Sequence, residues 1–89
     1  MNRHGCFCVY IVQCKNGTYY TGSTKNLENR LKQHNSGRGA KYLRGKGPVE
    51  LVYCREFKYY KNALNAEREI KTFNRHQKEK FIQSYEKNN

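Results

Sequence analysis

The sequence predicts an α/β (α+β) domain in which a small three-stranded antiparallel sheet is flanked by helices, in the order ββαβαα. Two segments rich in β-branched and aromatic residues stand on either side of Asn16-Gly17, which is the strongest short signal for a β-hairpin. A third such segment lies between two stretches whose apolar residues recur at helical spacing. Because three strands alone leave apolar surface open, the helices must cover the sheet to close a core.

The first half of the chain supplies the hairpin and one helix. Phe7–Cys14 and Thr18–Ser23 are the two predicted strands. Thr24 or Asn26 caps a helix that runs to about Asn35, because either side chain can accept a hydrogen bond from a free backbone N–H.

The second half begins with a glycine-rich loop over residues 37–48, followed by a strand over 49–57. Helices are expected over residues 62–73 and 74–85, each capped by the asparagine at its start.

Length and composition predict one domain over residues 1–89, with its core at about 7–83. The longest apolar run, Cys6–Val12, is seven residues long, whereas a membrane span needs about 20. The N-terminal residues show no secretory signal. We therefore expect a cytoplasmic protein that does not enter a membrane.

The charge predicts a polyanionic partner. Eighteen Lys and Arg residues against seven acids give a net charge of +11. Such an excess attracts phosphate backbones, because each neutralised phosphate releases counterions. Nucleic acid is the natural partner, and a basic protein that is merely soluble or ribosome-associated is the alternative.

The four cysteines, Cys6, Cys8, Cys14 and Cys54, do not show the paired CxxC spacing of a zinc ribbon. Three of them fall on one face of the first strand, which suits small buried apolar side chains. We expect reduced thiols, with zinc or a disulfide as the alternative.

The positions of two tyrosines depend on the register of the hairpin. With a two-residue turn, Tyr10 and Tyr20 fall on opposite faces of the sheet. With a three-residue loop that places Gly17 in a bulge, Val12 lies opposite Tyr20 instead. Tyr10, Tyr20 and Gly22 then share one face. We predict the bulged register, because it brings two phenols together beside a glycine that leaves room for a ligand.

The first helix carries polar residues on its apolar side. Leu27 and Leu31 mark the side that faces the core, and Arg30 and His34 fall on the same side at helical spacing. The structural alternatives are an ion pair for Arg30 and a local hydrogen bond for His34.

A carboxylate holds a similar position in the second helix. Glu67 shares a stripe with Ala63, Ala66 and Ile70, whereas the charges next to it, such as Glu69, point away. A carboxylate on an inward face needs a cation, a metal or a hydrogen-bond network. Its structural alternative is an ion pair with Arg30.

The loop over residues 37–48 contains cations, one tyrosine and no acid. Phosphates and an unpaired base are the partners that such a loop suits, and a solvated loop is the alternative. The candidate nucleic-acid-binding residues are Arg38, Lys41, Tyr42, Arg44 and Lys46.

Taken together, these positions resemble the GIY-YIG nuclease domain, in particular its small stand-alone bacterial members. The two motifs read Val9-Tyr10-Ile11 and Tyr20-Thr21-Gly22, ten residues apart. Arg30 and His34 match helix positions of the family, and Glu67 matches its metal-binding acid. The resemblance covers roughly residues 7–83 and is also seen with the nuclease domain of structure-specific endonucleases. Valine replaces a glycine in the first motif and threonine an isoleucine in the second, and neither change removes a catalytic group.

The resemblance implies a metal-dependent endonuclease that hydrolyses phosphodiester bonds in DNA and leaves 5′-phosphate and 3′-hydroxyl ends. Glu67 would hold one Mg²⁺ or Mn²⁺, since hard cations favour carboxylate oxygen. Arg30 would bind the non-bridging oxygens of the phosphate.

The resemblance also assigns roles to the remaining residues. Tyr10 would position or deprotonate the attacking water, although a phenol with a pKa near 10 is a poor base at neutral pH. Tyr20 would donate a hydrogen bond to the phosphate or the water, and His34 could relay a proton. Gly22 would give backbone clearance.

Two other functions stay open: a non-catalytic nucleic-acid-binding module with the same fold, and a basic structural protein of a nucleoprotein assembly. The nuclease is favoured because binding alone needs no inward carboxylate at Glu67. Recognition is expected to depend on DNA shape, backbone charge or a protein partner that supplies specificity.

Overall fold

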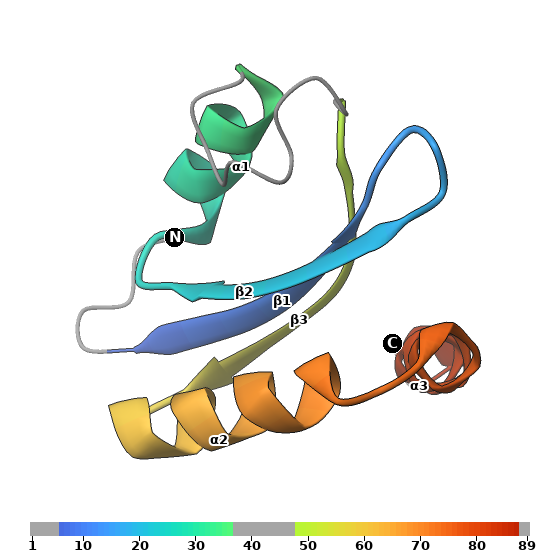
Figure 1. Ribbon diagram of the computed structural model, residues 1–89. Helices are drawn as coiled ribbons and strands as arrows, with labels where there is room; N and C mark the ends of the chain where they lie inside the picture. The colour runs from blue at the N-terminus through green and yellow to red at the C-terminus, as the bar shows by residue number, and fades with distance from the viewer. Residues whose placement is uncertain (1–5, 37–47, 88–89) are drawn as a thin grey trace.

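Three strands and three helices follow one another in the predicted order in the structure, a computed structural model that describes residues 6–36 and 48–87 (Figure 1). The sheet has the order β2-β1-β3, and both neighbouring pairs are antiparallel. The fold class and the order ββαβαα are therefore confirmed. The elements are β1 (Phe7–Gln13), β2 (Tyr19–Thr24), α1 (Leu27–Asn35), β3 (Glu50–Phe57), α2 (Tyr60–Lys71) and α3 (Arg75–Lys87).

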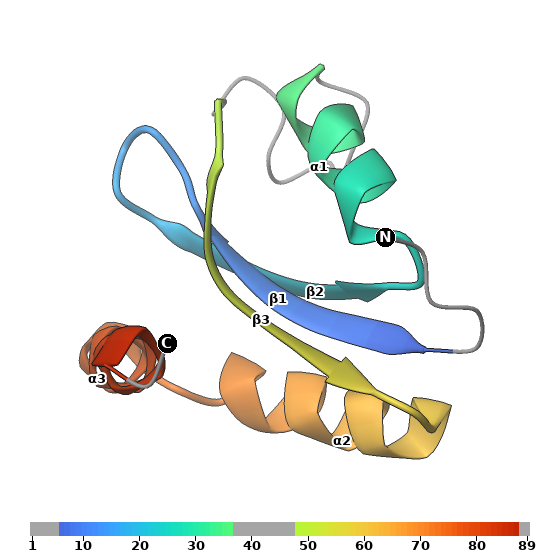
Figure 2. The same cartoon turned by 180° about the vertical axis from the view of Figure 1, so that it is seen from behind.

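The two faces of the sheet are covered by different helices. α1 lies on one face and α2 and α3 on the other, as the two opposite views show (Figures 1 and 2). The middle five residues of the central strand β1 are buried, since both of their faces are covered. Val9 and Ile11 pack toward α2 and α3, whereas Tyr10 and Val12 pack toward Leu27 of α1.

The hairpin turn adopts the bulged register. Gly17 has a φ of +92°, a conformation that L side chains rarely adopt. The backbone N–H of Cys14 donates to the carbonyl of Thr18 at 2.8 Å. Val12 lies opposite Tyr20 in the resulting ladder, which confirms the predicted register.

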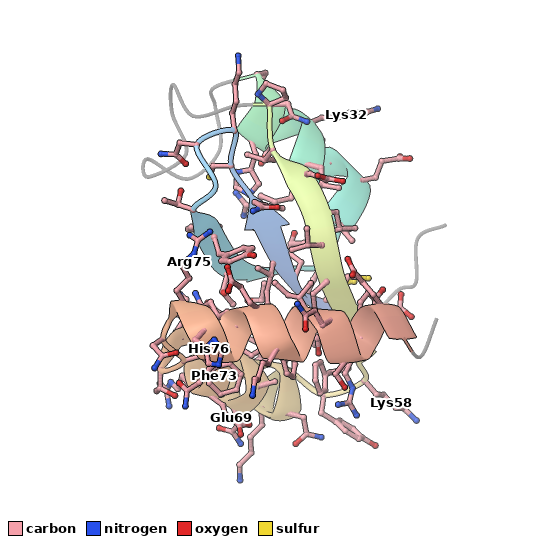
Figure 3. The ribbon with its side chains drawn as sticks, turned by 90° about the vertical axis from the view of Figure 1, so that its right-hand side faces the viewer. Lys32, Lys58, Glu69, Phe73, Arg75 and His76 are labelled. Carbon is pink, nitrogen blue, oxygen red and sulfur yellow. The ribbon has the colours of Figure 1, made fainter. Side chains whose placement is uncertain are left out.

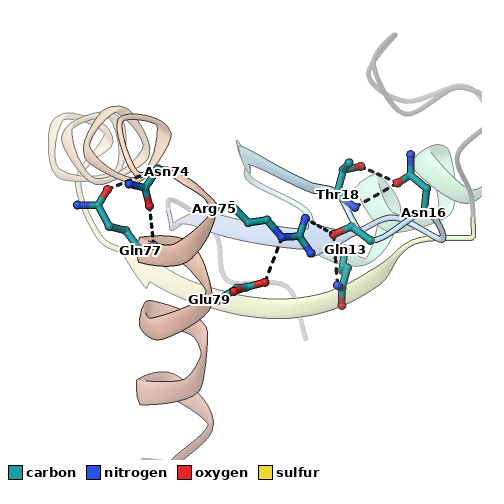
Figure 4. Close-up of polar contacts among 8 residues, drawn as sticks. Gln13, Asn16, Thr18, Asn74, Arg75, Gln77 and Glu79 are labelled. Atoms are coloured by element: carbon teal, nitrogen blue, oxygen red, sulfur yellow. Dashed lines mark hydrogen bonds and ion pairs between the residues drawn. The ribbon is translucent and has the colours of Figure 1, made fainter.

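Two of the predicted asparagine caps are present. Asn26, not Thr24, caps α1, because its Oδ1 accepts a hydrogen bond from the backbone N–H of Asn29 at 3.0 Å. Asn74 and Gln77 form a reciprocal pair at the start of α3 (Figure 4). Asn74 Oδ1 accepts from the Gln77 N–H at 2.8 Å, and Gln77 Oε1 accepts from the Asn74 N–H at 2.9 Å.

The prediction that Asn62 caps the second helix is wrong. α2 begins at Tyr60 without a side-chain cap, and Asn62 lies within its first turn. The Tyr60 ring packs edge-on against Phe7 at 5.4 Å between centroids. This contact between distant segments fixes where the helix starts, so a local capping signal is overridden.

The turn of the hairpin is also held by α3. The Arg75 guanidinium donates to the carbonyl of Gly17 at 3.0 Å and pairs with Glu79 at 3.1 Å (Figure 4). It also lies 5.2 Å from the centroid of the Tyr19 ring. The α3 N-terminus is thereby attached to the end of the sheet at which β1 turns into β2.

All four cysteines are free thiols, and Cys8 and Cys14 are buried. Within residues 6–36 and 48–87, no group of three or more His, Cys, Asp or Glu side chains is arranged to hold a metal ion. The helices described here are too short or too polar to cross a membrane.

Candidate active site

The candidate site is built around a buried contact between β1 and α1. The Tyr10 hydroxyl lies 2.8 Å from Nε2 of His34, in hydrogen-bond contact. Tyr10 is 1% exposed and His34 2% exposed. The prediction that His34 shares the inward side of α1 with Leu27 and Leu31 is therefore confirmed.

Tyr20 completes a cluster of three rings. Its centroid lies 6.5 Å from that of Tyr10 and 5.7 Å from that of His34. Tyr20 is half-buried, whereas the other two side chains are enclosed. Tyr20 is thus the member of the cluster that is most open to solvent.

Gly22 makes room for the tyrosines. A Cβ atom at this position would lie 2.7 Å from the Tyr10 Oη and 3.1 Å from the Tyr20 ring. Our expectation that this glycine leaves room for a ligand is therefore corrected, because the phenol of Tyr10 occupies that space. The absence of a side chain lets Tyr10 extend across β2, the edge strand of the sheet.

Burial sets the protonation states of the buried pair. It raises the pKa of Tyr10 strongly, the neighbouring Tyr20 adds to the increase, and the Arg30 charge only partly opposes it. Burial and then Arg30 lower the pKa of His34 below 6.5. At neutral pH, the pair is therefore a phenol against an uncharged imidazole, with the Arg30 guanidinium close enough to act on both.

Glu67 reaches the site from the opposite face of the sheet. Its Oε1 accepts a hydrogen bond from Ser23 Oγ at 2.7 Å, and its Oε2 pairs with Lys71 Nζ at 2.8 Å. Burial acts to raise the pKa of Glu67, but the hydrogen bonds from Lys71 and Ser23 outweigh it, so the pKa is lowered. The side chain is 15% exposed and is ionised at neutral pH.

Tyr10 and Glu67 both approach β2, the edge strand of the sheet, from opposite faces. Gly22 lies opposite Tyr10 in the ladder, and the next residue, Ser23, lies opposite Val9. Successive residues of a strand point to opposite faces, so Tyr10 arrives over one side of β2 and Glu67 under the other. The negative charge of Glu67 contributes to the raised pKa of Tyr10, so the two groups interact electrostatically.

The donor set at Glu67 fits a hard divalent cation. Mg²⁺ is often held by one or two carboxylates, with water and substrate phosphate filling its remaining positions. Glu67 supplies one ionised, partly exposed carboxylate. The Lys71 side chain that pairs with it is 51% exposed.

Ser23 and Lys71 are contacts that sequence reasoning missed. Lys71 stands four residues after Glu67, the spacing at which helical ion pairs form, and this signal was available. Ser23 follows from the bulged register, which places it on the same face as Val9 and hence toward α2.

The charges expected to point away from the site do so. Arg68 and Glu69 are exposed, and Figure 3 shows Glu69 on the far side of α2 from the sheet. The five loop residues predicted to bind nucleic acid lie outside the described residues: Arg38, Lys41, Tyr42, Arg44 and Lys46.

Comparison with known proteins gives one consistent family. The sequence model of the GIY-YIG catalytic domain matches residues 6–86. A UPF0213 protein of Clostridium perfringens is 51% identical over 76 residues, which cover 85% of this chain and 82% of that protein. A UPF0213 protein of Bacillus cereus is 44% identical over 86 residues, which cover 97% of this chain and 86% of that protein.

Two solved structures have the same fold. The solution structure of a UPF0213 protein from Bacillus halodurans is 42% identical, with a TM-score of 0.60 over 88% of this chain and 83% of that one. The solution structure of a protein from E. faecalis is 34% identical, with a TM-score of 0.67 over 97% of this chain and 92% of that one.

Proposed function

Because the chain belongs to the GIY-YIG family of nuclease domains, we propose that it is an endonuclease that hydrolyses phosphodiester bonds in DNA with one divalent metal ion. The observation that carries this proposal is that the neutral Tyr10–His34 pair and the ionised Glu67 both reach the edge strand β2, one from each face of the sheet. A phosphodiester reaction needs proton transfer from water and neutralisation of phosphate charge, and these two groups supply the two needs.

Tyr10 acts through His34. As a phenol it is no base by itself, because burial raises its pKa. In the proposed step, the water passes a proton to the Tyr10 oxygen while Tyr10 passes its own proton to Nε2 of His34. The water oxygen bonds to phosphorus, the bond from phosphorus to the 3′-oxygen breaks, and that oxygen takes a proton from solvent. The imidazolium of His34 then loses its proton readily, since burial and Arg30 lower its pKa.

Arg30 and Tyr20 bind the phosphate. Arg30 is half-buried, and its guanidinium has a planar set of donors that matches two phosphate oxygens. Tyr20 is the half-buried phenol of the cluster and would donate to the phosphate or to the water.

Glu67 would hold Mg²⁺ or Mn²⁺. When bound, the ion neutralises phosphate charge and stabilises the leaving oxygen. A single carboxylate at this position favours one metal ion. The net charge of +11 would attract DNA to the protein surface. We propose that the protein acts in the cytoplasm. The shape of the DNA or a protein partner would supply specificity.

A non-catalytic binding module is the second candidate. It is favoured by the Ser23 and Lys71 contacts, which satisfy both Glu67 oxygens without a metal. Incubation of the protein with labelled DNA in Mg²⁺, Mn²⁺ or EDTA separates the two. Metal-dependent cleavage supports the nuclease, and binding without cleavage supports the module.

A further inference from the structure

Exposed aromatic rings gather at the end of the sheet where α2 begins. The start of β1, the ends of β2 and β3, and the start of α2 lie together there (Figure 1). Tyr59 is 61% exposed and Tyr60 57%, the highest values among the large apolar side chains in the described ranges. Phe7 packs against Tyr60 beneath them. We call Phe7, Tyr59 and Tyr60 the aromatic platform.

Cations surround the aromatic platform. The Lys25 ammonium lies 5.2 Å from the centroid of the Phe7 ring, and that of Lys58 lies 5.7 Å from the Tyr59 ring. Lys61 is exposed in the first turn of α2. Lys58 is exposed and points away from the ribbon (Figure 3). Residues 57–66 contain Lys58 and Lys61 and no acid, so together with Lys25 three cations lie around the platform.

The platform is continuous with the candidate site. Tyr60 and Glu67 are seven residues apart and therefore lie on the same side of α2, about 10 Å apart along its axis. Lys25 follows two residues after Ser23, which holds Glu67.

We propose that the aromatic platform binds single-stranded DNA, with unpaired bases stacked on Tyr59 and Tyr60 and backbone phosphates held by Lys25, Lys58 and Lys61. A single strand presents unpaired bases and backbone phosphates. Exposed rings can stack on the bases, and the flanking cations can pair with the phosphates. A duplex hides its base faces within the stack, so it gains only the charge contacts. The inference rests on the proposed function and gives it a substrate class, DNA with a single-stranded segment next to the cleaved bond.

A binding experiment tests this without relying on catalysis. Fluorescence anisotropy in EDTA would compare the wild-type protein with the double variant Tyr59→Ala and Tyr60→Ala, using a labelled oligothymidylate and an abasic strand of equal length. The double variant should bind the oligothymidylate at least about tenfold more weakly. Its affinity for the abasic strand should not change, since that strand keeps the phosphates and lacks the bases.

Conservative and matched variants separate stacking from folding. Phenylalanine at both positions keeps the rings and should restore wild-type affinity. Leu51 is also exposed but lies at the opposite end of β3, so Leu51→Ala should leave binding unchanged. Because the sequence contains no tryptophan, Tyr59→Trp gives a single reporter whose fluorescence should be quenched by the oligothymidylate and not by the abasic strand.

The outcomes distinguish this inference from the proposed function. A weaker double variant supports the platform whether or not the protein cleaves DNA. Equal binding of the oligothymidylate by wild type and double variant overturns the platform and leaves the nuclease standing. An equal loss of affinity for the abasic strand also overturns base stacking.

Discussion

The hydroxyl of Tyr10 and Nε2 of His34 lie 2.8 Å apart, although the two residues are 24 positions apart in the sequence and belong to β1 and α1. Both side chains are enclosed. A hydrogen bond in such surroundings is expensive to break, because neither partner can turn to water. The pair therefore couples the position of α1 to the chemistry proposed for Tyr10.

Tyr10→Phe should reduce both activity and stability. Loss of the hydroxyl removes the proton path, and cleavage should fall by about 10²–10⁴-fold. His34 is left buried without this partner, which should lower the free energy of unfolding by about 1–3 kcal/mol. Single-turnover cleavage and urea unfolding measure the two effects. Tyr59→Phe removes an exposed hydroxyl and is the matched control. If the Tyr10→Phe variant cleaves DNA at the wild-type rate, Tyr10 has no part in the mechanism.

Stability should depend on pH through His34. Its pKa is lowered in the folded state from 6.5, so the unfolded chain takes up a proton at a higher pH than the folded one. The contribution of His34 is complete above pH 6.5 and is lost as the pH falls from there to the lowered pKa. Urea unfolding across this window should show the decrease, and His34→Gln should flatten it. An NMR titration that puts the pKa of His34 at or above 6.5 would contradict the assignment.

Glu67 contributes to the pH dependence of stability in a separate, more acidic pH range. Its folded pKa is lowered from 4.5, so its stabilisation is present above that value and is lost as the pH falls through the lowered pKa. The Glu67→Gln variant should therefore lose pH dependence only in this acidic range.

Gly22→Ala should disturb the site and Gly17→Ala should not. The new methyl group at position 22 would displace the Tyr10 hydroxyl, 2.7 Å away, from His34. Cleavage should fall together with stability, by about 1–3 kcal/mol. At position 17 the strain comes from the φ of +92°, so stability falls by about 1–2 kcal/mol and the rate of cleavage per folded molecule stays unchanged.

A second substitution tests the origin of that effect. Tyr10→Phe removes the oxygen that the methyl group would meet, so adding Gly22→Ala to it should cost less stability than Gly22→Ala does alone. Additive losses in free energy would show that the clash lies elsewhere.

Thr21→Val should stabilise the protein. Thr21 is 3% exposed, and within the described ranges its hydroxyl is buried with no hydrogen-bond partner. Valine has nearly the same shape and removes the desolvation cost of that hydroxyl, about 1 kcal/mol. A melting temperature higher by about 4–8 °C would follow for a domain of this size. A lower melting temperature would show that the hydroxyl is satisfied by water.

Local signals predicted the elements that local chemistry determines. Asn16-Gly17 predicted a hairpin, and its bulged register was chosen because that register brings Tyr10 and Tyr20 to one face. The caps at Asn26 and Asn74 were among the candidates that single side chains offered. The first residue of α2 could not be predicted from local signals, because it depends on the packing of Tyr60 against Phe7, which is distant in the sequence.

For the candidate site, the sequence predicted which side of its helix each residue occupies, but not which residue it contacts. Helical spacing placed His34 and Glu67 on inward sides. The partner of each depends on how far α1 and α2 lie from the sheet, which no pattern in the sequence measures. The Tyr10–His34 and Ser23–Glu67 hydrogen bonds therefore emerge only from the folded structure.

The most direct test compares Glu67→Gln with Glu69→Gln. Both variants remove one negative charge from α2, but Glu69 is exposed and turned away from the sheet (Figure 3). Cleavage of labelled branched, single-stranded and duplex DNA would be followed in Mg²⁺, Mn²⁺ and EDTA, and DNA affinity would be measured in EDTA. Wild type and Glu69→Gln should cleave only with metal, whereas Glu67→Gln should bind DNA as tightly and cleave it at least about 10²-fold more slowly. Cleavage by Glu67→Gln at the wild-type rate would contradict the role of Glu67 in catalysis.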